Sequence, residues 1–193
     1  HCVRANYCID RGYLGVDAVC IHNAATGREA KMPHVISPSE GPRKRVVVVG
    51  AGPAGLEAAR VAGDRGHAGV LMEAAPEAGG QIRLAAAARR RRELIGIVDW
   101  RLDCCRRSGV EMRFNLLAGP EDVLAEQPDI VVMGGTKDPD VAGIVAFRPD
   151  LVVVNDEENR YADAAALIDA GIAVYSMSPR SVEDVGEAVV DLA

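Results

Sequence analysis

The stretch Arg45-Val46-Val47-Val48-Val49-Gly50-Ala51-Gly52-Pro53-Ala54-Gly55 decides the fold of this chain. Its four valines predict a short buried strand, and its glycines allow a tight turn. The following run, Leu56 to Ala62, predicts a helix. Because the amide groups at the start of such a helix point at whatever fills the turn, the stretch predicts a pyrophosphate site formed by Gly50, Gly52, Pro53, Ala54 and Gly55.

An acidic residue follows the turn at the expected distance. Glu73 lies 18 residues after Gly55, where the dinucleotide-binding fingerprint places a carboxylate that hydrogen-bonds a ribose hydroxyl. A glycine pattern alone is weak evidence, but here a strand precedes it and a helix follows it. We therefore expect the site to bind the ADP part of FAD or NAD. The alternative is a turn without ligand, since the same glycines also let helix and strand pack closely.

The composition excludes some partners. The net charge of -6 and the pI near 5.3 argue against nucleic acid, which requires concentrated positive potential. The only basic block, Arg89 to Arg92, is followed at once by Glu93 and predicts a solvated face, with an anion or subunit contact as the alternative. No apolar run approaches the roughly 20 residues of a membrane span, and no signal peptide is recognisable. We expect a cytoplasmic protein without a membrane partner.

Three cysteines lie near the start of the chain. Without a secretory signal, Cys2, Cys8 and Cys20 are better explained as ligands of an iron–sulfur cluster or a metal than as disulfide partners. A cluster usually needs four ligands, and Ala5 stands where a cysteine would complete a C-x2-C-x2-C run. His1 and His22 are the nearest substitutes, and ordinary thiols in a loop are the alternative. Cys104 and Cys105 are adjacent on a predicted helix, so we expect one core and one surface residue rather than a redox pair.

The sequence up to about residue 133 resembles a known family. It is similar to the segment that follows the flavin-binding barrel in the trimethylamine dehydrogenase and dienoyl-CoA reductase family of the old yellow enzyme group. The matching stretches are Cys8-Ile9-Asp10-Arg11-Gly12-Tyr13, Cys20-Ile21-His22-Asn23, Thr26-Gly27-Arg28-Glu29, the Gly50 to Gly55 turn, and Ala78-Gly79-Gly80-Gln81-Ile82.

The resemblance implies two cofactor sites. In that family the cysteines hold a [4Fe-4S] cluster that passes electrons between FMN in the barrel and a domain that binds FAD or ADP. By resemblance, Cys2, Cys8 and Cys20 take three of four ligand positions, and Gly79, Gly80 and Gln81 join Glu73 and the turn at the dinucleotide. The barrel would be a missing domain or subunit. One departure is Gly69, because glycine weakens a strand interior and makes the position of Glu73 less certain.

The second half of the chain alternates between short apolar runs and helical segments. Pro128-Asp129 and Pro149-Asp150 each place a helix-ending proline and an aspartate before a strand. Helices are expected over 139–147 and 157–170, with Gly171 as a stop, and Ser181 opens a last helix with a capping box. The expected strands are 45–50, 69–73, 111–115, 129–133, 150–154 and 172–176.

Such alternation predicts an α/β fold: a doubly wound, Rossmann-like, mostly parallel sheet with right-handed crossovers. Six strands in the order 3-2-1-4-5-6 would form one sheet, with the ligand crevice between the first and fourth strands. Gly134 would then lie across this crevice from the glycine turn. We expect residues 1–44 to form a small cysteine-containing appendage and linker, and residues 45–193 to form the dinucleotide-binding domain.

The resemblance changes near residue 134. Residues from about 131 to 193 resemble the first lobe of periplasmic binding proteins for cobalamin and metal chelates. The motifs are Gly134-Gly135-Thr136-Lys137-Asp138-Pro139-Asp140, Arg148-Pro149-Asp150-Leu151-Val152 and Glu157-Glu158-Asn159-Arg160. This second resemblance implies a hybrid chain.

Three functions are therefore open at this point. The first is a redox module that binds FAD, NAD or ADP, as a fragment or relative of an iron–sulfur flavoprotein oxidoreductase. The second is a non-enzymatic hybrid or designed scaffold with a vestigial nucleotide site, and the third is a fragment of a corrinoid or metal-chelate receptor. Because the sequence offers no nucleophile with a paired base and no carboxylate pair, no catalytic residue is assigned.

Overall fold

The computed structural model describes residues 2–133, 139–155 and 159–177. Two compact units make up the chain, one of residues 1–118 and 125–133 and the other of residues 119–124 and 134–193. The main division therefore falls near residue 134, where the resemblance changes. Residues 1–44 belong to the same unit as the first half of the α/β region. The domain boundary expected at residue 44 stays a prediction.

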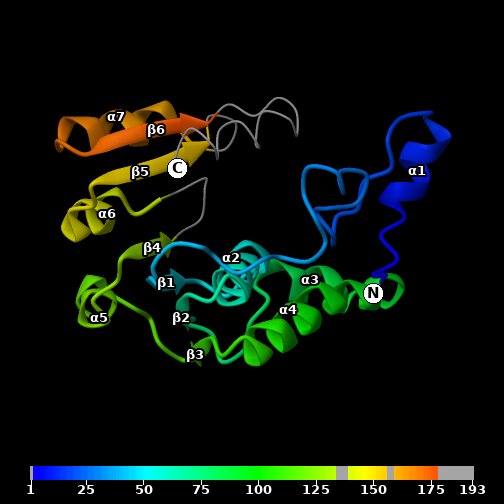
Figure 1. The fold of residues 1–193 in the computed structure, drawn as a ribbon, viewed down its shortest axis with the longest axis horizontal. Helices are drawn as coiled ribbons and strands as arrows, with labels where there is room; N and C mark the ends of the chain where they lie inside the picture. Colours follow the sequence, from blue (N-terminus) through cyan, green and yellow to red (C-terminus); the bar gives the residue numbers. More distant parts are fainter. Residues whose placement is uncertain (1, 134–138, 156–158, 178–193) are drawn as a thin grey trace. The chain divides into compact units, whose positions relative to one another are not determined.

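The first unit contains a four-stranded parallel sheet (Figure 1). Its strands are β1 (Arg45–Val49), β2 (Ala68–Met72), β3 (Glu111–Arg113) and β4 (Ile130–Met133), in the order β3-β2-β1-β4. This arrangement confirms the predicted α/β class and the first four places of the predicted strand order. It also puts β4 beside β1, as a nucleotide crevice between these two strands requires.

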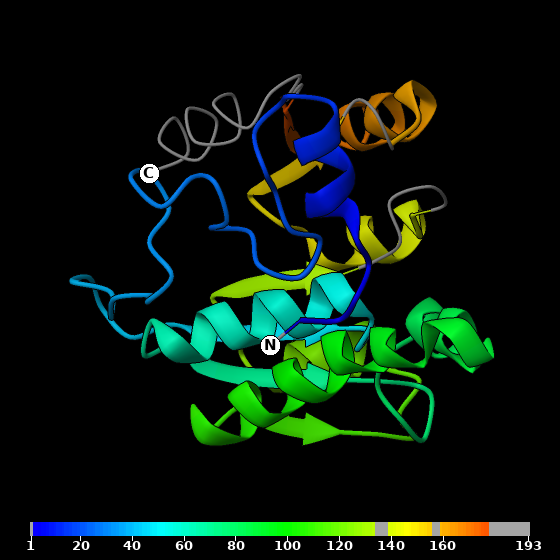
Figure 2. The same ribbon diagram turned by 90° about the vertical axis from the view of Figure 1, so that its right-hand side faces the viewer.

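Helices α2 (Pro53–Asp64) and α4 (Gly96–Arg107) lie side by side against this sheet (Figure 2). Alternate residues of a strand point to the same face, and on this face Val46, Val48 and Leu71 are buried in one apolar cluster. The cluster is completed from the helices by residues that are fully buried or nearly so, among them Leu56, Ala59, Val98 and Cys105. The buried residues of this cluster are therefore mainly aliphatic.

Both helices end in the same way. After α2, Gly66 has φ +86°, and the N–H of His67 donates to the carbonyl of Ala62 at 2.9 Å. After α4, Gly109 has φ +75°, and the N–H of Val110 donates to the carbonyl of Cys105 at 2.9 Å. This is the Schellman motif, which needs a left-handed residue after the helix. Each motif turns the chain directly into the next strand.

The remaining helices of the described chain are short. They are α1 (Tyr7–Tyr13), α3 (Gln81–Ala87), the 3₁₀ helix η1 (Arg89–Ile95), α5 (Pro120–Ala125), α6 (Val141–Phe147) and α7 (Tyr161–Asp169). Arg89 to Arg92 are exposed on η1, as predicted. None of these described helices, nor α2 or α4, is long and apolar enough to cross a membrane.

The second unit contains a separate sheet. Strands β5 (Leu151–Asn155) and β6 (Ala173–Met177) pair in parallel, and Gly171, with φ +82°, ends the preceding helix as predicted. The prediction of one six-stranded sheet is wrong, because β4 and β5 belong to different sheets. Strand alternation fixes the direction of crossovers but does not specify which edges pair. The helix expected from Ser181 lies outside the described residues.

Candidate functional site: the glycine turn and the cysteine segment

The turn after β1 has the geometry of a phosphate-binding turn. Gly50 has φ +100°, which a residue with a side chain rarely adopts, and Gly52 is the extended N-cap of α2 with Pro53 at its first position. A Cβ on Gly52 would meet no atom within 4 Å. A Cβ on Gly55, in contrast, would collide with the carbonyl oxygen of Gly50. Gly55 therefore serves the close packing of helix and strand, whereas Gly52 leaves open space before the helix N-terminus.

Glu73 lies directly after β2, and its carboxylate bonds both the glycine turn after β1 and the loop after β2. One carboxylate oxygen accepts the N–H of Ala51 at 2.6 Å, and the other accepts the N–H of Ala75 at 2.8 Å. Each carboxylate oxygen has a second lone pair, so Glu73 can still accept a ribose hydroxyl. The glycine at position 69 is explained by Val110, whose methyl carbon would lie 3.1 Å from a Cβ there. Gly69 thus lets Val110 approach β2 and does not displace Glu73.

Gly79 and Gly80 also contact the turn after β1. The N–H of Gly79 donates to the carbonyl of Ala51 at 2.7 Å, and a Cβ on Gly80 would stand 3.5 Å from the Cα of Gly52. Both glycines have positive φ, +124° and +47°, and Gln81 is the first residue of α3. Among the predicted cofactor residues, exposed Ala54 lies in the first turn of α2. Gly134 lies outside the described residues.

The cysteine segment is organised less completely. Cys2 and Cys8 are exposed and Cys20 is half-buried. Two of the sulfurs accept hydrogen bonds from nearby backbone N–H groups. The N–H of Arg4 donates to the Cys2 sulfur and the N–H of His22 donates to the Cys20 sulfur, each at 3.4 Å. No group of three His, Cys, Asp or Glu residues that could hold a metal ion forms within residues 2–133, 139–155 and 159–177. With three thiols that do not converge, the donor set does not fit a complete four-thiolate cluster.

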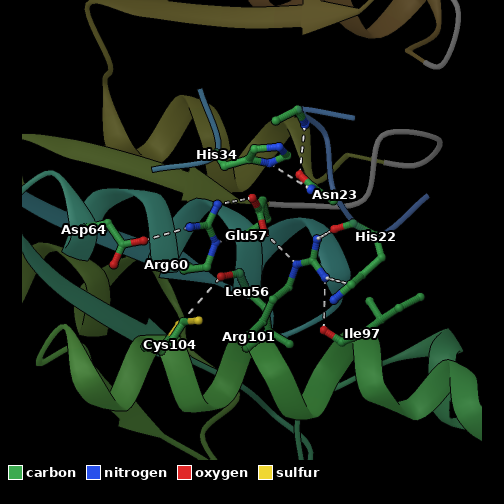
Figure 3. Close-up of polar contacts among 12 residues, drawn as sticks. His22, Asn23, His34, Leu56, Glu57, Arg60, Asp64, Ile97, Arg101 and Cys104 are labelled. Carbon is green, nitrogen blue, oxygen red and sulfur yellow. Dashed lines mark hydrogen bonds and ion pairs between the residues drawn. The ribbon is translucent and has the colours of Figure 1, made fainter. Parts of the chain in front are cut away.

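A buried polar network joins the cysteine segment to the helices (Figure 3). Arg101, on α4, donates from Nε to Glu57 of α2 at 2.7 Å and from Nη2 to the carbonyl of His22 at 3.2 Å, while its Nη1 lies 3.0 Å from His22 Nδ1. Arg60 also bonds Glu57, and its guanidinium lies 5.2 Å from the centre of the Trp100 ring. Sequence reasoning missed Arg101, because a single arginine in a helical pattern is ordinarily a surface residue.

The network lowers the pKa values of His22 and Glu57. Burial, together with the charge of Arg101, lowers the pKa of His22 and so favours its neutral ring. Burial alone would raise the pKa of Glu57, but the hydrogen bond from Arg60 and the charge of Arg101 hold it below its usual value. The network therefore contains two cations, Arg60 and Arg101. Both contact the Glu57 carboxylate, and Arg101 also contacts the neutral His22 ring.

Cys104 and Cys105 are both buried, so the expectation that one of them lies on the surface is wrong. Burial raises the pKa of Cys105 to about 11. A thiol in this state is a poor nucleophile. These two residues belong to the core of the first unit rather than to a redox site.

Comparison with known proteins identifies the first part of the chain. No family model matches. The chain is 58% identical over 132 residues to a probable N-methylproline demethylase of Rhizobium meliloti and 52% identical over 133 residues to an N,N-dimethylglycine/sarcosine dehydrogenase of Chromohalobacter salexigens. A multifunctional alkene reductase/demethylase of Caballeronia cordobensis is 48% identical over 132 residues. The chain is homologous to a segment of the trimethylamine dehydrogenase and old yellow enzyme family.

Each of these matches covers 68% of this chain but only 19% of the relative. The chain thus spans about a fifth of the length of these family members, which are oxidoreductases by name. The matched lengths agree with the segment, residues 1 to about 133, in which the sequence shows the resemblance. None of the three relatives supports the resemblance of residues 131–193 to periplasmic binding proteins, which stays a prediction.

Solved structures of the same family show the fold. Histamine dehydrogenase from Rhizobium sp. 4-9 matches with a TM-score of 0.62 at 23% identity, over 100% of this chain and 34% of that one. A 2-naphthoyl-CoA reductase matches with a TM-score of 0.62 at 20% identity, over 91% of this chain and 34% of that one. At these identities the likeness concerns the chain fold and leaves the ligand open.

Proposed function

We propose that the chain is the nucleotide-binding part of a flavin-dependent oxidoreductase, and that it binds the ADP moiety of FAD or NAD at the Gly50 to Gly55 turn. The observation that carries this proposal is the open space at Gly52, beside the first amides of α2. Those amides have no partner within a helix and carry a partial positive charge, so they suit a diphosphate. Glu73 would accept the ribose hydroxyls, and Gly79, Gly80 and Gln81 would border the same site.

The redox chemistry would belong to the flavin or nicotinamide, which transfers the electrons once it is bound. The residues of this chain have a different task. They hold the diphosphate through backbone amides, orient the ribose through Glu73, and keep the turn closed through the bond from Ala51 to that carboxylate. Because Glu73 is negative, a ribose with a free 2'-hydroxyl is preferred over one that carries a phosphate.

The cysteine segment would contact the missing flavin-binding barrel. None of the residues of α1 is buried, and Figure 1 shows it away from α2 and α4 of the same unit. Several large apolar side chains of this segment are exposed, with Tyr13 at 88%, Leu14 at 70% and Ile9 at 55%. A seven-residue helix with this much exposed apolar surface is typical of an interaction site. We assign Cys2, Cys8 and Cys20 as candidate ligands, with a fourth ligand still required.

The names of the relatives suggest the substrate class. Two of them are demethylases and one acts on N,N-dimethylglycine or sarcosine, so an N-methylated amine is the substrate we propose for the whole protein. The groups that would bind it are expected in the barrel.

The test is a calorimetric titration of the chain with ADP, FAD and NAD, with Gly52→Ala as the matched control. Binding of at least one ligand to the wild type, and its loss in the variant, would support the proposal. If the three titrations of the folded wild type show no heat of binding, the chain is a scaffold with a vestigial turn. A parallel titration with cobalamin would detect the third function, that of a corrinoid receptor fragment.

A further inference from the structure

Arg101 is a buried cation whose hydrogen-bonding groups all have partners on three different elements. Its relative exposure is 7%, and its guanidinium reaches Glu57 on α2, the carbonyl of Ile97 on its own helix, and two acceptors of His22 in the cysteine segment. A buried charge is tolerated only when it is paired and hydrogen-bonded in this way. Loss of the segment from this surface would therefore leave the guanidinium with two fewer partners.

The orientation of the loop Cys20–Asn23 depends on these contacts. In this loop the apolar Ile21 is 49% exposed, whereas the polar His22 is only 6% exposed. Burial of apolar surface alone would favour the opposite arrangement. The His22 ring also meets Trp100 edge to face, with ring centres 5.1 Å apart. The contacts with Arg101 and Trp100 thus turn the His22 side chain inward. In this arrangement the backbone N–H of His22 donates a hydrogen bond to the sulfur of Cys20.

The other side of the contact leads to the nucleotide turn. Glu57 lies in the second turn of α2, one helical turn after Pro53, where the helix begins. Since Arg101 bonds Glu57 and His22 at the same time, the loop is attached to the same helix whose first amides face the turn. Arg60 bonds Glu57 as well.

We propose that Arg101 is a positioning residue that docks the Cys20–Asn23 loop onto α2 and α4, and thereby fixes the Cys20 sulfur relative to the helix that begins at the nucleotide turn. The role of Cys20 as a candidate ligand rests on the proposed function. The docking itself does not, because it is carried by contacts among residues of this chain.

The experiment measures the alkylation of each cysteine under reducing, anaerobic conditions by peptide mass spectrometry, with exposed Cys8 as the internal reference. Arg101→Met should raise the rate at Cys20 relative to Cys8 by about tenfold or more, since one charged hydrogen bond contributes a factor of that order. Arg101→Lys should act in the same direction, because one ammonium cannot bond Glu57 and both acceptors of His22 at once.

Arg60→Met is the matched control. It removes a cation that also pairs with Glu57 and also lies over Trp100. Because the hydrogen bonds from Arg101 to His22 stay in place, the relative rate at Cys20 should not change. An equal rise in Arg60→Met and Arg101→Met would overturn the proposal, as would an unchanged rate in Arg101→Lys. If Arg101→Met does not fold, Arg101→Lys carries the test. Calorimetry with ADP on the same proteins reports separately on the proposed function.

Discussion

Gly55 lies so close to the carbonyl oxygen of Gly50 that a Cβ at residue 55 would stand less than 3.0 Å from it. A Cβ added to Gly52, three residues earlier, would meet no atom within 4 Å. The φ of Gly52 is -69°, which any residue adopts. Two glycines of one motif therefore have separable tasks. Gly55 allows the packing of α2 on β1, and Gly52 leaves the space before the N-terminus of α2 open.

Gly55→Ala should destabilise the first unit. The added methyl group must push the helix away from the strand, and overpacking of this kind typically costs about 1–3 kcal/mol. Thermal unfolding followed by circular dichroism should show a lower melting temperature than in the wild type. Gly52→Ala should melt like the wild type, and equal melting temperatures for the two variants would contradict the assigned tasks.

Gly52→Ala should instead weaken nucleotide binding. Its methyl group would occupy the space in which the diphosphate approaches the first amides of α2, and we expect the affinity for ADP to fall at least about tenfold. Calorimetric titration measures the change. Undiminished ADP binding in the folded variant would place the nucleotide elsewhere.

Glu73→Gln should affect both stability and selectivity. The carboxylate accepts the N–H groups of Ala51 and Ala75, whereas an amide has one acceptor oxygen and turns its NH2 group toward the other N–H, at a cost of about 1–3 kcal/mol. Loss of the negative charge should also narrow the preference for ADP over its 2'-phosphorylated form. The melting temperature and the ratio of the two dissociation constants are the measurements. A ratio equal to that of the wild type would exclude Glu73 from the ribose site.

The charge of Glu57 should make the free energy of unfolding decrease as the pH falls into the acid range. The folded chain lowers the pKa of this carboxyl below its ordinary value of 4.5, so its contribution is fully present above that pH and is lost as the pH falls through the lower, folded pKa. Urea unfolding of the wild type and of Glu57→Gln should therefore differ most near neutral pH. The difference should shrink between about pH 5 and about pH 3. Parallel pH profiles for the two proteins would show that Glu57 does not contribute through its charge.

Ala5→Cys should improve iron binding. Four thiolates are the usual ligand set of an iron–sulfur cluster, and this substitution completes the C-x2-C-x2-C run with Cys2 and Cys8. After anaerobic reconstitution with iron and sulfide, the variant should retain more iron per chain and absorb more strongly in the visible range than the wild type. Ala5→Ser is the matched control. If the serine variant binds as much iron as the cysteine variant, residue 5 is not a ligand position.

Much of the geometry around the Gly50 to Gly55 turn was predictable because its signals are local. A valine run, three glycines and an acid at a set distance specify a strand, a turn and a carboxylate within about thirty residues. In the structure, both Glu73 and Gly79 bond the backbone of Ala51 in the turn: the Glu73 carboxylate accepts its N–H, and the N–H of Gly79 donates to its carbonyl. The cysteine segment was harder to predict, because ligand spacing shows which residues are available and does not show whether they converge.

The sequence by itself determined the alternation of strands and helices, the parallel order of β3, β2, β1 and β4, and the position of the glycine turn. Each of these depends on periodicity and on backbone conformations that few residues tolerate, and both properties are local. The sequence also predicted that β5 lies beside β6. Tertiary structure alone decided that these two strands form a sheet of their own and that Arg101 is buried between Glu57 and His22. Such contacts join residues up to 79 positions apart, and their free energy depends on burial and geometry that no short stretch of sequence contains.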